Sequence, residues 1–332
     1  MLCSVGRVAD EVLSTLSSSR TASLYLCAAK QLSQGNDMRK GWITLMDHTT
    51  HISRALTIAG SDSGAGAGIQ ADLKTFAALG VYGLSALTAI TAQNTEGVRA
   101  AHELPPAMVT AQIDAVLEDM GADAAKTGML SSAAVIEAVA ESMRKWQLSL
   151  VVDPVMRAKG GDPLLAPEAV NTLRTMLLPL AEVITPNLPE AEVLTGRNIE
   201  TIDEMKEAVR IIHDQGPRHV VVKGGHRAAE PIDIYFDGKQ IVELRAERVM
   251  TRHTHGTGCT FSAAIAALLA RGWPVGEAIT GAKQYITGAI RHAPGIGHGH
   301  GPVEHFWMYT EQGEATPLPS KEQHWSPWFS RV

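Results

Sequence analysis

A glycine-rich turn that opens a predicted helix is the most chemically suggestive feature of the sequence. Gly256, Thr257 and Gly258 precede Cys259, and helical spacing then runs through 258–270. Backbone N–H groups at such a helix entry form a site for an anion, and phosphoryl transfer needs this stabilisation of its oxygens. Cys259 stands where a helix N-terminus would lower the pKa of a thiol. The alternative is a flexible turn with a small buried cysteine.

A second glycine-rich segment, 59–74, follows a short apolar run. Further glycines stand at positions 64, 66 and 68 after Gly60, and Asp72 comes one turn inside the next predicted helix. This spacing is not the G-x-G-x-x-G of dinucleotide sites, and no acidic residue ends the next strand. The segment fits either tight packing of a strand on a helix or a small-molecule site. In the first case Asp72 would be solvated or a cap partner.

An amide and an amide–carboxylate pair follow other predicted strands. Gln93 could read the donor and acceptor edge of a heterocycle, although a loop amide more often bonds local backbone. Asn187 and Glu190 are three apart at a helix start and so share one face. They suit Mg²⁺ held through water beside phosphates. They also fit a helix capping box, which the spacing alone favours.

Apolar runs alternate with helix-period segments from Arg54 to Pro302, and the candidate residues come after the apolar runs. This alternation predicts a mostly parallel sheet with helices on both faces and ligands beyond the carboxyl ends of its strands. Asp237-Gly238 predicts an added antiparallel hairpin. We expect strands at 54–59, 84–90, 98–102, 124–126, 148–152, 183–185 and 219–223, and helices at 67–79, 105–117, 131–145, 167–178, 188–194, 202–214, 258–270 and 275–292.

The composition suits a folded enzyme domain and argues against several other classes of protein. The chain has 332 residues, 45% of them hydrophobic, and a net charge of −6, so neither nucleic acid nor a membrane is an expected partner. Cys3, Cys27 and Cys259 have no metal-ligand spacing and form no disulfide framework, which favours a reducing, cytoplasmic compartment. No apolar run approaches the roughly 18 residues of a membrane span. The absence of a Walker A motif excludes a P-loop NTPase.

The two ends of the chain differ from its patterned centre. Residues 1–50 are rich in Ser, Thr and Ala; we expect a disordered or weakly helical extension, or a start assigned too early with Met46 as the true start. A transit peptide is the alternative, against which the acidic residues count. Residues 311–332 contain several prolines and are expected to form an irregular tail. His298, His300 and His305 suggest a metal, but their glycine-spaced setting favours a plain loop.

Taken together, these segments resemble the ribokinase superfamily and, within it, the hydroxymethylpyrimidine/phosphomethylpyrimidine kinases of thiamine biosynthesis. The resemblance runs from Arg54 to Trp307. It implies a ribokinase-like kinase domain over 51–310, a three-layer α/β/α sandwich around a mostly parallel sheet. Such a kinase uses ATP and Mg²⁺ and works as a homodimer on a small pyrimidine. The similar stretches are 59–74, 92–95, 126–130, 162–165, 184–190, 223–226 and 254–264.

The resemblance also implies roles for particular residues. Cys259 would be the base for the acceptor hydroxyl, at the position where sugar kinases of the superfamily carry Asp. The pyrimidine pocket would be lined by Gly60, Asp72, Gln93 and Met129. At the phosphate end, Gly256, Thr257 and Gly258 would form an anion hole. Asp153 and Lys223 would lie near the nucleotide phosphates. Asn187 and Glu190, the N-x-x-E pair, would organise Mg²⁺ through water.

Two other functions stay open on the sequence. A pyridoxal/pyridoxine kinase of the same fold is the nearer one, because some similar enzymes with cysteine at this position accept that substrate. A non-catalytic regulator that binds a pyrimidine or nucleotide is the other, and the intact set of Lys223, Asn187 and Glu190 argues against it. A Rossmann dehydrogenase is the weakest alternative, since the glycine spacing fails.

Overall fold

The computed structural model describes residues 51–157, 164–225 and 231–310. The chain divides into two units, residues 1–51 and 52–332, and the described elements all belong to the second. The extension predicted over 1–50 and the tail predicted over 311–332 lie outside the described residues. Within the described ranges, no helix is both long and apolar enough to span a bilayer.

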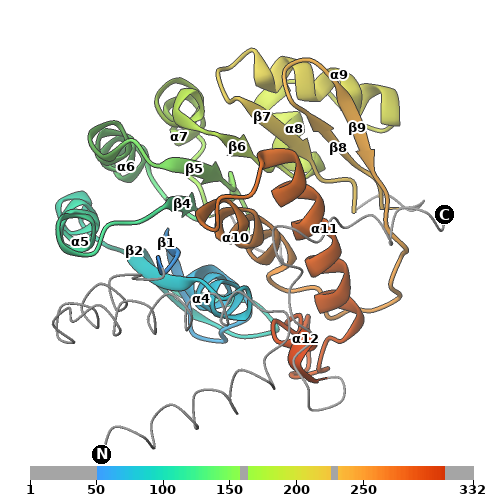
Figure 1. Cartoon of the computed structure of the whole chain (residues 1–332), viewed down its shortest axis with the longest axis horizontal. Coiled ribbons are helices and arrows are strands. Elements are labelled where there is room, and N and C mark those ends of the chain that lie inside the picture. Colours follow the sequence, from blue (N-terminus) through green and yellow to red (C-terminus); the bar gives the residue numbers. More distant parts are fainter. Residues whose placement is uncertain (1–50, 158–163, 226–230, 311–332) are drawn as a thin grey trace, which may run out of the picture. The chain divides into compact units, whose positions relative to one another are not determined.

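One mixed sheet of nine strands forms the centre of the described unit (Figure 1), in the order β3-β2-β1-β4-β5-β6-β7-β8-β9. Strands β2, β1, β4, β5, β6 and β7 are adjacent in this order and run parallel to one another. At one edge β3 pairs antiparallel with β2, and at the other β8 pairs antiparallel with β7 and β9 with β8. The predicted hairpin around Gly238 is confirmed as β8–β9. The strands are β1 Arg54–Asp62, β2 Tyr82–Gln93, β3 Val98–Glu103, β4 Ala124–Thr127, β5 Ser149–Val152, β6 Val183–Ile184, β7 His219–Val222, β8 Asp233–Phe236 and β9 Ile241–Leu244.

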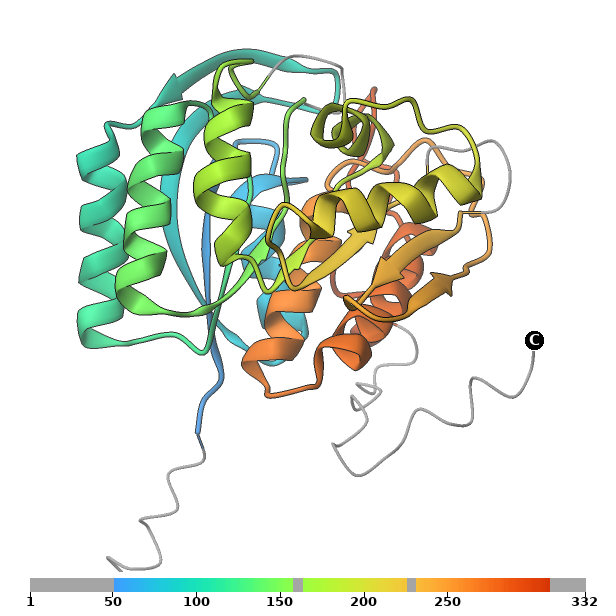
Figure 2. The same cartoon turned by 90° about the horizontal axis from the view of Figure 1, so that it is seen from above.

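Helices cover both faces of the sheet, which confirms the predicted three-layer α/β/α arrangement. Figures 1 and 2 show α5, α6 and α7 side by side on one face, and the same apolar core extends to α8 and α9. The other face is covered by α4, α10 and α11, with the short α12 against α11. The helices are α4 Gly68–Ala78, α5 Pro106–Asp119, α6 Ala133–Trp146, α7 Ala169–Thr172, α8 Leu188–Thr195, α9 Ile202–His213, α10 Thr257–Ala270, α11 Val275–Arg291 and α12 Trp307–Thr310.

Three predicted elements, one helix and two strands, differ from the structure. The helix predicted over 167–178 is three short pieces: after α7 comes a π-helical turn, Leu173–Leu177, and then a 3₁₀ turn, Leu178–Leu180. Pro179 cannot continue the hydrogen-bond ladder of a regular helix. The strands predicted at 54–59 and 84–90 are longer, because β1 reaches Asp62 and β2 reaches Gln93. Both extensions carry polar residues to the carboxyl edge of the sheet.

A row of polar side chains crosses the sheet face that α4 and α10 cover. Strand side chains alternate between faces, so residues two apart share one face. On this face, apolar residues pack first against the helices: Ala55, Ala124, Val151, Val183 and Val221. The polar row consists of the residues two positions after each of these: Thr57, Lys126, Asp153, Thr185 and Lys223. The side chains of the row are buried, apart from Lys223 at 15% exposure.

Candidate active site

The carboxylate of Asp62 organises the glycine-rich turn that follows β1. Its Oδ1 accepts the N–H of Gly64 at 2.8 Å, and its Oδ2 accepts those of Gly66 at 3.0 Å and Ala67 at 2.8 Å. The same Oδ2 lies 2.9 Å from Nε2 of His255, which begins the second glycine-rich turn. Burial alone would raise the pKa of Asp62, but the hydrogen bonds from His255 and the backbone hold that pKa below its usual value.

The two glycine-rich turns touch through backbone atoms. Gly256 has φ of +78°, and a Cβ on it would lie 1.8 Å from the carbonyl oxygen of Gly66. A Cβ on Gly66 would in turn lie 2.3 Å from the His255 ring. Only glycine fits at these two positions without displacing the other turn. The sequence indicated both turns but not their contact.

The N-terminus of α10 faces the charged end of the polar row. Thr260 N–H donates to the oxygen of Gly256 at 2.8 Å, whereas no acceptor among the described residues is recorded for the N–H groups of Gly258 and Cys259. A Cβ on Gly258 would lie 3.3 Å from Nζ of Lys223 and 3.5 Å from Oδ2 of Asp153. Two donor amides and an ammonium thus surround one place, where an anion can bind.

Lys223 and Asp153 form a largely buried ion pair at this place, with Nζ and Oδ1 3.0 Å apart. Thr185 Oγ1 donates to the same carboxylate at 3.3 Å, and Ser262 Oγ donates to it at 3.4 Å. Burial works to lower the pKa of Lys223, but Asp153 and Glu190 raise it above its usual value. Lys223 therefore keeps its positive charge beside the anion site.

Asn187 and Glu190 form the capping box of α8, as the spacing favoured. Asn187 Oδ1 accepts the N–H of Glu190 at 2.9 Å, and Glu190 Oε2 accepts the N–H of Asn187 at 2.8 Å. The backbone of Asn187 pairs with that of Lys223, so the capping box adjoins the Lys223–Asp153 pair. Burial is the main reason that the pKa of Glu190 rises to about 7, with Asp153 adding to the effect and Lys223 opposing it.

The thiol of Cys259 has the opposite acidity to the predicted one. Burial, together with the nearby Asp72 and Asp153, raises its pKa to about 11, although Lys126 and a hydrogen bond from the Gly68 N–H work to lower it. The expectation of a lowered pKa considered only the helix N-terminus and neglected the cost of placing a thiolate away from water. The thiol is therefore protonated at neutral pH in the ligand-free protein.

Asp72 lies beneath the site rather than on its surface. Its carboxylate is fully buried, accepts from Thr57 Oγ1 at 2.6 Å, and contacts Lys126 Nζ at 2.8 and 3.0 Å. Asp72 neither caps α4 nor contacts solvent, so the expectations that it would be a solvated residue or a cap partner are both wrong. No role was predicted for Lys126. Its signal in the sequence is a lysine inside an otherwise uncharged buried strand, Ala124–Thr127.

The remaining residues of the predicted pyrimidine pocket lie at the ends of three neighbouring strands. Gln93 ends β2, and its Nε2 is 3.3 Å from Nε2 of His255. Gly60 is in β1, and a Cβ on it would lie 3.4 Å from both the sulfur and the terminal methyl of Met129, which follows β4. Half-buried amide and thioether groups thus adjoin the glycine turns.

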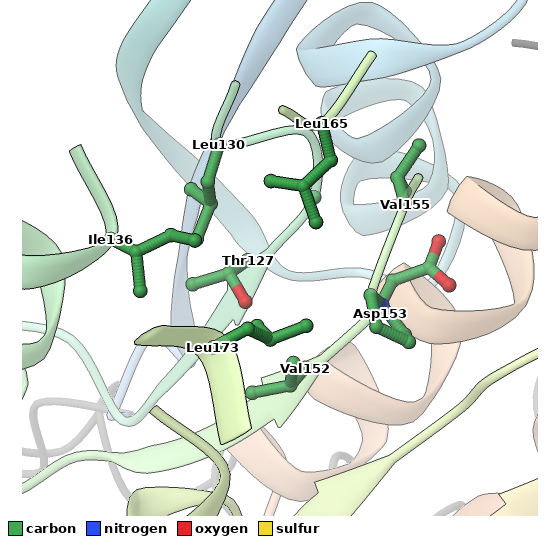
Figure 3. A pocket seen from close by; sticks show the side chains of 10 residues that line it. Thr127, Leu130, Ile136, Val152, Asp153, Val155, Leu165 and Leu173 are labelled. Atoms are coloured by element: carbon green, nitrogen blue, oxygen red, sulfur yellow. The ribbon is translucent and has the colours of Figure 1, made fainter. Parts of the chain in front are cut away.

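A small cavity lies on the opposite side of Asp153 from α10. Figure 3 shows apolar side chains around it, with the Asp153 carboxylate directed away toward α10. The cavity volume is about 10 Å³, which is room for roughly one water molecule. Thr127 Oγ1 lines it and has no hydrogen-bond partner among the described residues. It is too small for a substrate, and the Asp153 carboxylate faces the other way, toward α10.

His305 belongs to the core and not to a metal site. Its side chain is 2% exposed and its Nε2 lies 3.1 Å from Thr260 Oγ1 in α10. Burial lowers the pKa of His305 to about 3. His300 instead contacts backbone, with Nδ1 3.0 Å from the oxygen of Arg252.

Comparison with known proteins found close similarity to one family of kinases. The family model for phosphomethylpyrimidine kinase matches residues 62–304. The thiamine biosynthesis bifunctional protein ThiED of Geobacter sulfurreducens is 54% identical over 252 residues, or 75% of this chain and 51% of that protein, so the chain spans about half of its length. The hydroxymethylpyrimidine/phosphomethylpyrimidine kinase of Streptomyces coelicolor is 50% identical over 256 residues, 77% of this chain and 95% of that protein. The solved ADP complex of Bacillus subtilis pyridoxal kinase has a TM-score of 0.73 and 44% identity, covering 77% of this chain and 98% of that one.

The contact between the two glycine turns predicts a large difference between two glycine-to-alanine variants. Gly196 has φ of +69° but open space around it, so Gly196→Ala should cost only the left-handed strain, about 1–2 kcal/mol. Gly256→Ala adds a collision with Gly66 and should cost about 1–3 kcal/mol more. Urea unfolding of both variants measures this difference. Equal losses of stability would show that the turns are not in contact.

Proposed function

We propose how this chain works from one premise: it belongs to the phosphomethylpyrimidine kinase family, whose model matches residues 62–304. It is a phosphotransferase of thiamine biosynthesis. Its reaction is the ATP-dependent phosphorylation of 4-amino-5-hydroxymethyl-2-methylpyrimidine and then of the resulting monophosphate. The main structural support for this function is that Lys223 and Asp153 lie next to Gly258 in the first turn of α10. That arrangement suits a γ-phosphoryl group.

The phosphate end of the site stabilises the charge that phosphoryl transfer develops. The N–H groups of Gly258 and Cys259 donate to the oxygens of the transferred group, and the Lys223 ammonium neutralises part of their charge. The carboxylates of Asp153 and Glu190 lie buried around Lys223, and carboxylate oxygens are the ligands that fit Mg²⁺. Asn187 and Glu190 would hold that ion through water, and the ion neutralises phosphate charge when it is bound.

The acceptor end holds the pyrimidine between Gln93, Met129 and the backbone at Gly60. The Gln93 amide hydrogen-bonds the aminopyrimidine edge, which leaves the hydroxymethyl group toward Cys259. In the first reaction the hydroxyl oxygen forms a bond to the γ-phosphorus, the bond to the bridging oxygen of ADP breaks, and ADP takes that electron pair. The Cys259 thiol, which is protonated at neutral pH, first loses its proton to solvent, and the resulting thiolate then takes the hydroxyl proton.

The second reaction starts from an acceptor that is already an anion. A phosphomonoester oxygen needs no proton removed, so this step depends on positioning and on neutralisation of charge. Cys259 and the phosphate end of the site therefore contribute differently to the two reactions. Lys223 and the amides of α10 serve both.

A coupled ADP-release assay tests the proposed function directly. With ATP and Mg²⁺, purified protein should phosphorylate hydroxymethylpyrimidine and then the monophosphate, with product masses confirmed by mass spectrometry. Pyridoxal kinase is the second candidate function, because the Bacillus subtilis structure of similar fold bears that name. Pyridoxal or pyridoxine should give a kcat/KM well below that of the pyrimidine. No ADP formation with any of these alcohols would favour a non-catalytic binding protein.

Removal of the Cys259 thiol should separate the two reactions. We expect Cys259→Ala to lower the single-turnover rate of the first phosphorylation by about 10²-fold or more, the usual contribution of a general base, and that of the second by less than about threefold. The raised thiol pKa of about 11 adds a pH signature, because the thiolate fraction rises with pH throughout the range 7–9. The first rate should therefore rise with pH in the wild type and be nearly flat in the variant. Equal losses in both reactions would exclude a base.

Glu190 should make Mg²⁺ binding sensitive to pH. Because its pKa is about 7, the carboxylate is mostly protonated at pH 6 and mostly ionised at pH 8, so the KM for Mg²⁺ should fall about tenfold over this range. Glu190→Gln should raise that KM and remove this part of its pH dependence.

The matched control for Glu190 is Glu204, which occupies the same position in the capping box of α9 with Thr201. Glu204→Gln makes the same change in an equivalent capping box, which Gln can still form, and should leave the KM for Mg²⁺ unchanged. Protonation of ATP itself affects both variants alike. Identical Mg²⁺ profiles for the two variants would remove Glu190 from the metal site.

We also propose that the protein acts as a homodimer in the cytoplasm. The edge strand β3 is exposed along most of its length, and Tyr82 and Ile90 of the neighbouring β2 expose apolar side chains. Such an edge is normally covered or paired in a stable protein. A purely monomeric mass in analytical ultracentrifugation at micromolar concentration would contradict the dimer.

A further inference from the structure

We propose that residues 297–301, which we call the strap, are a positioning segment for the acceptor. The strap fastens the backbone turn that follows Gln93 to the backbone of His255, and so holds Gln93 at a fixed distance from the first turn of α10. The effect on the acceptor rests on the proposed function, whereas the effect on the turn itself does not.

The strap is the glycine- and histidine-rich segment for which a metal site is one interpretation of the sequence. Among the described residues, no group of three or more side chains could hold a metal ion. Of the five strap residues only Gly301 is buried, and none carries an apolar side chain. The burial of apolar groups therefore does not fix the path of the strap, and its hydrogen bonds and close backbone contacts do so instead.

One side of the strap contacts Thr95, two residues after Gln93. The His300 N–H donates to the backbone oxygen of Thr95 at 2.8 Å, and the Gly299 N–H donates to Thr95 Oγ1 at 3.2 Å. A Cβ on Gly299 would lie 2.0 Å from the same backbone oxygen, and a Cβ on Gly297 would lie 2.4 Å from Thr95 Oγ1. These two glycines thus let the strap lie directly against the turn.

The other side of the strap contacts His255. The His255 N–H donates to the oxygen of Gly301 at 3.0 Å, and His255 forms a parallel β-bridge with Pro302. A Cβ on Gly301 would lie 2.4 Å from Nδ1 of His253, so the strap also contacts the segment that leads into His255. Three consecutive residues, 299–301, therefore bridge two segments that are far apart in the sequence.

The bridged segments carry the two side chains that meet at the acceptor end of the site. Gln93 Nε2 lies 3.3 Å from His255 Nε2, and the Asp62 carboxylate contacts the same histidine nitrogen at 2.9 Å. Gln93 is proposed to bind the pyrimidine, and α10, whose first amides are proposed to bind the phosphoryl group, begins at Thr257 just after His255. The strap thus sets the separation of acceptor and donor, and misplacement of a reacting group by about 1 Å can cost about 10²-fold in rate.

The strap is anchored in the core just after its last residue. Val303 is 2% exposed, and the Glu304 N–H donates to the oxygen of Ala289 in α11 at 2.9 Å. The turn after Gln93 is more open, since Glu96 in it is exposed. A collision between strap and turn should therefore displace the turn, and Gln93 with it.

Two glycines of the same loop give a matched pair of variants. Gly297 has φ of +86° and Gly295 has φ of +71°, so alanine is strained at both positions. The Cβ added at position 297 meets Thr95, whereas the one added at position 295 lies 3.7 Å from its nearest contact, Nε2 of His253. We expect Gly297→Ala to raise the KM for hydroxymethylpyrimidine about tenfold and Gly295→Ala to change it by less than about twofold. The KM for ATP should stay within about twofold of wild type in both variants.

A double variant shows whether the contact with Thr95 causes the effect. The three atoms nearest to the Cβ added at position 297 are Oγ1, Cγ2 and Cβ of the Thr95 side chain. Thr95→Gly removes all three, so combining it with Gly297→Ala should bring the KM for the pyrimidine at least about threefold below that of Gly297→Ala alone. Independent structural damage would instead add the two losses. A KM of the double variant equal to or above that of Gly297→Ala would overturn the proposal.

Hydrogen exchange of the ligand-free, full-length protein tests the strap without any substrate. Amide exchange in a peptide that covers residues 93–97 should be faster in Gly297→Ala than in wild type and unchanged in Gly295→Ala, because only the first variant pushes the turn off the strap. Equal KM values for the pyrimidine in the two glycine variants, or equal exchange, would overturn the positioning role. Failure of the wild-type protein to phosphorylate any pyrimidine would instead overturn the proposed function, and the exchange result would still decide whether the strap holds the turn.

Discussion

The carboxylate of Asp62 is the group on which the geometry of the site depends. It joins two turns through His255, which is 193 residues away in the sequence, and it binds three backbone amides of its own turn. Loop closure over that distance is entropically costly, so the contact has to be specified by more than nonspecific packing. The glycines at 66 and 256 let the two backbones meet, and the contact between the Asp62 carboxylate and the His255 ring sets their alignment. Gln93, which is proposed to bind the pyrimidine, contacts the same His255 ring.

The polar row explains why charged groups are tolerated so deep in the sheet. Its lysines each have an acidic partner, Asp72 for Lys126 and Asp153 for Lys223, and hydroxyls of Thr57 and Thr185 complete the hydrogen bonds. A buried charge is stable only when it is paired and its donors are satisfied. Helices α4 and α10 bring their N-termini over the same row, so the floor supplies fixed charges and the helices supply amides. Phosphoryl-transfer chemistry needs both.

Most of the fold could be predicted from the sequence, because buried parallel strands give continuous apolar runs and Gly or Pro ends them. The alternation of runs located every strand of the sheet, and the spacing of Asn187 and Glu190 indicated the capping box. The sequence did not reveal the roles of Asp62 and Lys126, because their importance comes from partners on other elements. The thiol of Cys259 was misjudged for a related reason. A helix terminus is visible in the sequence, whereas the loss of water around the half-buried thiol is a property of the packed structure.

The direct contact between the two glycine-rich turns limits how this enzyme could acquire a new alcohol substrate. Any side chain added at Gly66 or Gly256 would collide with the other turn, since the two turns are in direct contact. Gln93 and Met129, which are proposed to line the acceptor pocket, have half-buried side chains and therefore more freedom to change. Laboratory evolution of acceptor preference should consequently begin at those two positions, with the glycines kept fixed.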